Sequence, residues 1–366
     1  MENNIKFDYF MYGAFLDGKL FYFSRNRRLL KSWDIFGRGS ITIETVLDNE
    51  THFDRIISFD NSIYSIDASG RWLYSVSPAD NKASKISLPC ESALFNNFID
   101  FFSYGASIYI IPFYQAALWK YDVSSHEIIK HAYPLNGNYS KIHNSYVGVK
   151  NDGEYWLFPY KGSCALKFDL SDGTFSEYPS PDGYRFVDAT VHNGKIYTIS
   201  VEGDIFEWNH QSGNYKLEYR ADIGYRPSDI VVTPFDYIIL PHDINNPIYV
   251  VNKNSKTISE VHDYPDGFFY DDNSPSAYAG CVEYDDQVVF LPHSTSHLMV
   301  ISKKDGKISW IKTPVLNDDM FCRSINDVFT PRMHQEGEGE LTYWLQAINA
   351  KMDFEDITPL IQYRLK

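Results

Sequence analysis

Two short segments of the chain repeat a set of residue types that could bind a charged ligand. They read Tyr184-Arg185-Phe-Val-Asp188 and Tyr225-Arg226-Pro-Ser-Asp229. A guanidinium group binds a carboxylate or phosphate through two parallel hydrogen bonds, and an aromatic ring stacks on sugars, bases or side chains. The pattern therefore predicts that these arginines and tyrosines recognise a ligand with an anionic group.

Looser copies of this pattern occur elsewhere, and a second pattern accompanies them. The looser copies contain Arg55, Asp100, Arg323 and, at the equivalent place, His143. The second pattern is an apolar residue, a proline and then an aromatic residue or histidine; its last residues are Phe113, Tyr160, His242 and His293. Because proline cannot donate a hydrogen bond to a sheet, it ends a strand, and we expect the next side chain to point to a rim.

Some of these residues could also carry acid–base chemistry. The catalytic candidates are His242, His293, Tyr184 and Asp188. His143 or His297 could join the two candidate histidines in an acid–base pair or a metal site. The histidine and cysteine spacings match no metal-binding motif, so we expect no metal and no cofactor. The repeated arginines and aspartates could instead form salt bridges between structural units, and this alternative stays open.

The patterns recur because the chain itself repeats. Residues 185–218 read as four short strands separated by Asn-Gly, Glu-Gly and Ser-Gly, dipeptides that supply the positive φ values of tight hairpins. The same order recurs in residues 14–44, 55–89 and 145–178. An aromatic or apolar marker of the second strand returns every 40 to 54 residues, at Tyr22, Tyr64, Tyr109, Tyr155, Tyr197, Tyr237, Val289 and Tyr343. Third strands end in an acidic or amide residue that we expect to bond backbone amides in a turn: Asp34, Asp122, Asp169, Asn209 and Asn252.

A four-stranded unit of this length is typical of one blade of a β-propeller. A β-helix turn is shorter, and a β-sandwich does not repeat four strands eight times. We therefore predict an all-β, single-domain propeller over residues 1–366, with eight or alternatively seven blades. The approximate blades are 12–51, 52–95, 96–140, 141–182, 183–223, 224–272, 273–318, and 319–366 plus 1–11, so that both termini close the ring. Only residues 95–102 show a spacing that could indicate a helix.

The repeat resembles the broad class of bacterial kelch-like and quinoprotein-like propellers over the full length of the chain. Trp33-Asp34 is similar to the signature of WD40 blades, and residues 300–310 resemble the tryptophan-docking motif of quinoprotein propellers. Residues 65–72 resemble the sialidase Asp box, displaced by one residue. The resemblance implies a fold and no specific family or activity.

Composition limits the partners and the setting. The formal net charge of −15 disfavours nucleic-acid backbones and anionic membranes, so neither is an expected partner. The four cysteines, Cys90, Cys164, Cys281 and Cys322, are widely spaced, which favours free, buried thiols in a reducing compartment. The first residues lack the features of a signal peptide, and we expect a cytoplasmic protein.

Three functions remain in competition at this point. The favoured one is a recognition propeller that binds a peptide, glycan or other anionic small ligand at the channel mouth. The alternatives are a glycan- or peptide-directed hydrolase or lyase, and a protein-interaction scaffold. Residues 262–276, which are acidic and aromatic, could form a lid or a docking loop in any of the three.

Overall fold

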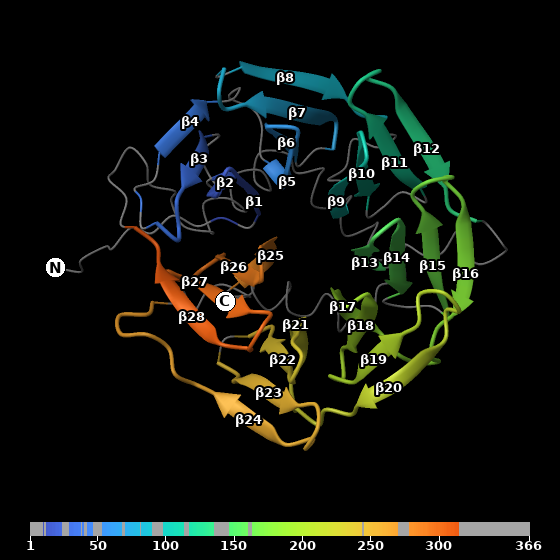
Figure 1. The fold of residues 1–366 in the computed structure, drawn as a ribbon, viewed down its shortest axis with the longest axis vertical. Coiled ribbons are helices and arrows are strands. Elements are labelled where there is room, and N and C mark those ends of the chain that lie inside the picture. Colours follow the sequence, from blue (N-terminus) through green and yellow to red (C-terminus); the bar gives the residue numbers. More distant parts are fainter. Residues whose placement is uncertain are drawn as a thin grey trace, which may run out of the picture.

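The computed structural model describes residues 10, 12–23, 29–37, 39, 42–46, 53–67, 70–80, 82–89, 98–112, 117–134, 146–159, 163–243, 245–269 and 278–314. Within these residues the chain forms seven four-stranded antiparallel sheets, arranged as the blades of a ring (Figure 1). Blades 1 to 3 consist of β1–β4 (Gly13–Leu16, Lys19–Phe23, Leu29–Trp33, Thr42–Val46), β5–β8 (Phe53–Phe59, Ser62–Asp67, Trp72–Ser77, Lys82–Ser87) and β9–β12 (Phe98–Tyr104, Ser107–Pro112, Ala117–Asp122, Ile128–Ala132).

Blades 4 to 7 complete the ring with strands of similar length. They are β13–β16 (Tyr146–Asn151, Glu154–Pro159, Cys164–Asp169, Phe175–Pro179) and β17–β20 (Phe186–His192, Lys195–Ser200, Ile205–Trp208, Tyr215–Tyr219). The last two are β21–β24 (Pro227–Val232, Asp236–Pro241, Ile248–Asn252, Ile258–Val261) and β25–β28 (Tyr278–Tyr284, Gln287–Pro292, His297–Ser302, Ile308–Lys312). The predicted all-β propeller is confirmed.

Every blade is a meander in which the first strand lies innermost and the fourth outermost (Figure 1). The connections therefore end on two opposite faces of the ring. We call the upper face the one that carries the loops between second and third strands and between blades. The lower face carries the hairpins between first and second strands and between third and fourth strands.

The hairpins of the lower face follow from their residues. Asn193 and Gly194 have φ values of 51° and 72°, and Asp17 and Gly18 have 49° and 76°. Two consecutive positive φ values suit a two-residue hairpin, and glycine, asparagine and aspartate adopt them at the lowest cost. The turn dipeptides were thus read correctly as hairpins.

Apolar side chains hold the blades together at the seams, by which we mean the interfaces between adjacent blades. Seven buried apolar clusters occupy seven seams among the described residues. One of them joins blade 7 to blade 1 through Val289 and Leu298 on one side and Leu20 and Trp33 on the other. The described blades therefore close the ring by direct packing, and seven is the alternative that matches, rather than eight.

The predicted eighth unit, residues 319–366 with 1–11, lies outside the described residues except for Phe10. The Phe10 ring stacks on Tyr22 with 3.9 Å between centroids, and its backbone N–H donates to the carbonyl of Pro292 at 3.2 Å. Phe10 thus fills the seam between blades 7 and 1 from outside any strand. Closure of the ring by both termini stays a prediction.

The second-strand markers locate the strands, but they do not all face the same way. All seven described markers lie in second strands and are buried. In blades 2, 3, 5 and 7 the marker packs in the seam with the following blade. Tyr22, Tyr155 and Tyr237 pack instead in the seam with the preceding blade. A shift of one residue along a strand turns the side chain to the other face of the sheet.

Residues 95–102, the one possible helix, are not helical where they are described. Phe98–Tyr104 is the innermost strand β9, and its pairing with β10 has a β-bulge opposite Ile111 and Pro112. The bulge breaks the alternation of the strand, so that Phe98 and Phe101, three residues apart, both enter the same apolar cluster. Two apolar residues three positions apart in a bulged strand therefore had the spacing expected for one face of a helix.

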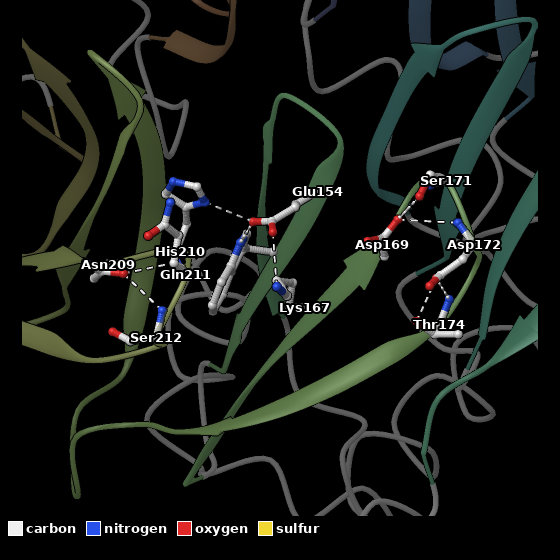
Figure 2. Close-up of polar contacts among 11 residues, drawn as sticks. Glu154, Lys167, Asp169, Ser171, Asp172, Thr174, Asn209, His210, Gln211 and Ser212 are labelled. Carbon is white, nitrogen blue, oxygen red and sulfur yellow. Dashed lines mark hydrogen bonds and ion pairs between the residues drawn. The ribbon is translucent and has the colours of Figure 1, made fainter.

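The acidic and amide residues at the ends of third strands cap turns, as predicted. Asp169 Oδ1 accepts hydrogen bonds from the backbone and hydroxyl of Ser171, and Asn209 Oδ1 accepts from the backbones of Gln211 and Ser212 (Figure 2). Asp34, Asp122 and Asn252 accept equivalent backbone bonds. These five residues shape hairpins on the lower face.

Neither Cys164 nor Cys281 is fully buried. Cys164 begins an outer strand, and Cys281 lies on β25, an innermost strand whose inner edge solvent reaches. The expectation of buried thiols is wrong for these two, and Cys90 and Cys322 lie outside the described residues. In the part of the chain that the structure describes, no helix has the length and apolar character needed to cross a membrane.

Candidate functional site

The innermost strands of blades 2, 3, 5 and 6 share a β-bulge near their upper end. The pairing skips one residue before Arg55, Asp100, Asp188 and Asp229, and these four pair with equivalent residues of the second strands. A bulge re-aims the side chain that follows it. All four residues are partly exposed although their strands surround the axis of the ring (Figure 1), so solvent reaches this inner edge.

Three of these four residues contact the next blade along the chain. Arg55 Nη2 donates to the carbonyl oxygens of Phe98 and Ile99 at 2.7 and 2.9 Å. Asp100 Oδ2 accepts from the Tyr155 hydroxyl at 3.0 Å. These contacts join blade 2 to blade 3 and blade 3 to blade 4. For Arg55 and Asp100 the structural alternative, a tie between units, accounts for the observed bonds.

Asp188 and Asp229 form a pair of neighbouring carboxylates on β17 and β21. Asp188 Oδ2 accepts from the backbone N–H of Ile230 at 2.9 Å, which brings it beside the residue that precedes Ile230. Burial, followed by the charge of Asp229, raises the pKa of Asp188 well above its ordinary value. Burial also raises the pKa of Asp229, against the opposing hydrogen bond from Ser228. The pair therefore retains protons at pH values where free aspartates have lost them.

Arg226 and His242 meet on the upper face of blade 6. The backbone N–H of His242 donates to the carbonyl of Arg226 at 3.1 Å, and both side chains are exposed. Surrounding protein shields part of the imidazole from water, and this desolvation, followed by the charge of Arg226, lowers the pKa of His242. His242 is therefore a neutral donor or acceptor beside a permanent cation near neutral pH.

The equivalent place in blade 5 holds Arg185 but no histidine. The backbone N–H of Val201 donates to the carbonyl of Arg185 at 2.8 Å, as His242 does in blade 6. Arg185 Nη2 lies 3.6 Å from Glu202 Oε1, and the two side chains are 33% and 48% exposed, so this ion pair is weak. The two arginines thus occupy matching positions above the two aspartates.

Tyr184 and Tyr225 lie beside these arginines in sequence but are directed into their own blades. The Tyr184 hydroxyl donates to Asp204 Oδ2 at 3.0 Å, and its ring meets Phe206 edge-on. The Tyr225 hydroxyl donates to the carbonyl of Pro247 at 2.8 Å. Both hydroxyl groups are engaged within the protein, which suits tyrosines that position the loop.

His293 and His297 lie in a buried loop of blade 7, away from the surface. Residues 293–297 are all at most 5% exposed. The segment 262–269 covers this loop: Phe269 N–H donates to Ser296 Oγ at 2.8 Å, and Phe268 stacks on His297. The described part of residues 262–276 therefore packs on blade 7. Phe269 itself remains 49% exposed.

The structure brings together only part of the predicted set. Asp188, Arg185, Arg226 and His242 gather on blades 5 and 6, whereas Arg55 contacts blade 3 and His293 is enclosed in blade 7. Phe113, His143, Tyr160 and Arg323 lie outside the described residues. No group of three metal-binding side chains occurs among the described residues.

One residue of this region was not singled out from the sequence as part of the site. Cys281 follows the irregular pairing of β25, at the inner edge of blade 7. Loss of hydration at the inner edge, followed by the charges of Asp229 and Asp188, raises the pKa of its thiol well above the ordinary value. Cys281 lies three residues after β25 begins, next to the place where blades 2, 3, 5 and 6 have a charged residue, and this was the available signal.

No family model matches this sequence, and no curated protein matches it. Several solved structures are similar to this chain in fold. Virginiamycin B lyase from Staphylococcus aureus, in its selenomethionine-substituted form, has a TM-score of 0.59 at 13% identity, covering 85% of this chain and 97% of that chain. YCF48 from Cyanidioschyzon merolae has a TM-score of 0.59 at 11% identity, covering 79% and 95%. A structure of YCF48 bound to D1 peptide has a TM-score of 0.56 at 13% identity, covering 84% and 93%. These likenesses show that the chain shares the propeller fold.

Proposed function

We propose that this propeller binds a peptide on its upper face, over blades 5 and 6. The observation that carries the proposal is a repeat in which an arginine directly precedes the innermost strand, β17 or β21, and an aspartate follows its bulge. Arg185 and Arg226 suit a carboxylate or carbonyl group, and the carboxyl oxygens of Asp188 and Asp229 suit N–H donors. A peptide presents both kinds of group along one chain.

Two further observations support a peptide over other ligands. His242 adds a neutral hydrogen-bonding group beside Arg226, so the face does not consist of cations alone. One of the similar propellers, YCF48, has been solved with a D1 peptide. That likeness concerns the fold, and it makes a peptide the first ligand class to test.

The test is a selection from a pool of random heptapeptides on the immobilised protein, read by mass spectrometry. The wild type is compared with the double variant R185A/R226A and with R220A, which removes an exposed arginine of the same blade that pairs with Asp204. We expect R220A to retain the selected peptides and R185A/R226A to lose at least about ten-fold in affinity, since a hydrogen bond to a charged group contributes about 1.5–3 kcal/mol.

Circular dichroism and thermal unfolding of the same variants complete the test. A folded double variant that selects the same peptides as the wild type contradicts the proposal. An unfolded double variant contradicts it too, because the arginines then hold blades together instead of binding a ligand.

A second candidate function is acid–base catalysis on a bound peptide or glycan, as in a hydrolase or lyase. The observation in its favour is the pair Asp188 and Asp229, because neighbouring carboxyl groups with raised pKa values can divide the roles of acid and base. Turnover of a selected ligand that disappears in D188N, while binding remains, would favour this function over recognition alone.

We also propose that the protein works in a reducing, cytoplasmic setting. The proposal is supported by Cys281, whose thiol is exposed at the inner edge of blade 7. Fractionation of the source cells, followed by alkylation of free thiols, tests this. Recovery of the protein in an oxidising compartment with its thiols blocked contradicts it.

A further inference from the structure

A cleft opens on the lower face at the seam between blades 7 and 1, on the opposite side of the ring from the proposed peptide site. It has a volume of about 690 Å³. Its walls come from the hairpin between β1 and β2, the hairpin between β25 and β26, and the turn that follows β3. Three turns from two blades thus converge on one space.

Aromatic rings form one wall of this cleft. Tyr284 stacks on Phe36 with 5.5 Å between centroids and an interplanar angle of 21°, and on Phe15 at 4.3 Å. Phe36 is 39% exposed although it is a large apolar side chain. A stacked and exposed aromatic face is a surface on which a planar or cationic group can lie.

The polar groups of the cleft are almost all hydrogen-bond acceptors. Four carboxylates line it against a single amine: Asp17, Asp34, Asp285 and Asp286 against Lys19. Gln287 Oε1 is buried and accepts no hydrogen bond in the structure. That oxygen is covered by protein, so the carboxylates are the acceptors that a ligand can reach, and they make the cleft complementary to a group with several N–H donors.

The same place in the seam between blades 4 and 5 is closed by the protein's own donors. Glu154 begins the second strand of blade 4 as Gln287 begins that of blade 7. Glu154 accepts from Lys167 Nζ at 3.0 Å, Trp156 Nε1 at 3.1 Å and His210 Nδ1 at 3.3 Å (Figure 2). In blades 7 and 1 the register puts three apolar residues at those donor positions: Val300, Val289 and Ile35.

We propose that this cleft binds the guanidinium group of an arginine presented by a partner polypeptide. A guanidinium is planar, carries five N–H donors and stacks on aromatic rings, so it matches the carboxylates of the cleft and the face of Phe36 together. The net charge of −15 draws a basic segment toward the protein at long range. This site is independent of the peptide site on the upper face.

The probe for this site is the blocked tripeptide acetyl-Gly-Arg-Gly-amide, titrated into the full chain at low ionic strength and followed by saturation-transfer NMR. Its matched control is the citrulline tripeptide, which keeps the shape and removes the charge. We expect the arginine tripeptide to bind at least ten-fold more tightly. Equal binding of the two tripeptides overturns the proposal.

Variants then assign the binding to the cleft. D285N/D286N removes two carboxylates and F36A removes the aromatic wall, and each is expected to weaken binding at least five-fold. The control is D152N, which changes an exposed aspartate at the same turn position of blade 4, also with a φ of 51°. Undiminished binding by D285N/D286N, or an equal loss in D152N, overturns the assignment to this cleft. R185A/R226A, on the opposite face, should bind the arginine tripeptide as the wild type does.

Discussion

The seam between blades 4 and 5 and the seam between blades 7 and 1 use the same backbone positions in opposite ways. In the first, Glu154 is surrounded by Lys167, Trp156 and His210 and accepts a hydrogen bond from each. In the second, the buried oxygen of Gln287 accepts no hydrogen bond, and the cleft beside it is lined by carboxylates. One seam satisfies its acceptor with the protein's own donors, and the other does not.

This difference separates groups that hold the fold together from groups available for recognition. Repeat proteins offer an internal control, because each blade presents the same positions in a similar environment. A polar residue satisfied in one blade and unsatisfied in the equivalent place of another marks a change of role. Substitutions in the two seams test this separation, because those in the closed seam should mainly affect stability and those in the open seam should mainly affect binding.

Removing the Trp156 side chain should cost the most stability. Trp156 is fully buried in the seam between blades 4 and 5, where it packs on Trp208 and Phe158, so W156A opens a cavity and removes a donor to Glu154. We expect a loss of about 3–5 kcal/mol in the free energy of unfolding, measured with urea. F36A, at the open seam, should cost less than about 1 kcal/mol. Similar losses for the two variants would remove the distinction between the seams.

Removing the Glu154 carboxylate should have the next largest effect. E154A leaves Lys167 without its ion pair, and we expect a loss of about 1–3 kcal/mol at pH 7. Q287A should not destabilise the protein and should stabilise it slightly, because it removes a buried acceptor that has no donor. Urea unfolding of the two variants at pH 7 gives the comparison, and a larger loss in Q287A would reverse it.

The stability that Glu154 contributes to the seam between blades 4 and 5 should depend on pH. Burial raises the pKa of Glu154, but the hydrogen bonds from Lys167, Trp156 and His210 and the Lys167 charge outweigh it, so the net shift is downward. The advantage of the wild type over E154Q should therefore be complete above pH 4.5 and disappear as the pH falls through the lowered pKa. An advantage that persists in acid would show that the carboxylate charge is not the cause.

Asp188 should show the opposite sign, because its pKa is raised instead of lowered. D188N keeps an acceptor for the Ile230 N–H and removes the repulsion from Asp229, so it should stabilise the protein at pH 8 by about 1 kcal/mol. The gain should shrink as the pH falls and vanish below the ordinary value of 3.8, where both carboxyl groups are protonated in either state. Thermal unfolding across this pH range measures it. A loss of stability at pH 8 would identify Asp188 as a tie between blades.

The smallest effect is expected from closing the open seam with the protein's own cation. Q287K places an ammonium group among Asp17, Asp34 and Asp286, and a partly exposed ion pair contributes about 0.2–1 kcal/mol. The variant should be slightly more stable than the wild type in urea, and should lose the arginine tripeptide. Retained binding in a stabilised Q287K would show that the tripeptide binds elsewhere.

The strands and turns of this fold could be predicted because their signals are local. Asn193-Gly194 marks a hairpin whatever surrounds it, and Asp169 and Asn209 cap turns within their own blades. The direction in which a strand residue points depends on its register, and the second-strand markers do not reveal it. Tyr155 and Tyr237, for example, face the preceding blade. The bulge in β9 likewise turned a strand into an apparent helical spacing.

In the candidate site, too, contacts set by repeat positions could be predicted, and contacts set by the path of the chain in space could not. Arg226 and His242 could be placed together because both occupy repeat positions on the upper face. The engagement of the Tyr184 hydroxyl by Asp204 could not be foreseen, since it depends on the path of the loop before β19. The open cleft could not be predicted from the sequence for a different reason. Gln287 and Phe36 become neighbours only because blade 7 packs on blade 1, and that packing depends on the number of blades.

The bulged position at the inner edge has a consequence for evolution and protein engineering. The same position carries arginine in blade 2 and aspartate in blades 3, 5 and 6. Three of these side chains bond the next blade, and Asp188 and Asp229 influence each other. An exchange at this position therefore changes the charge around the axis and a contact between blades at once, so a designer should exchange the bonded partner with it.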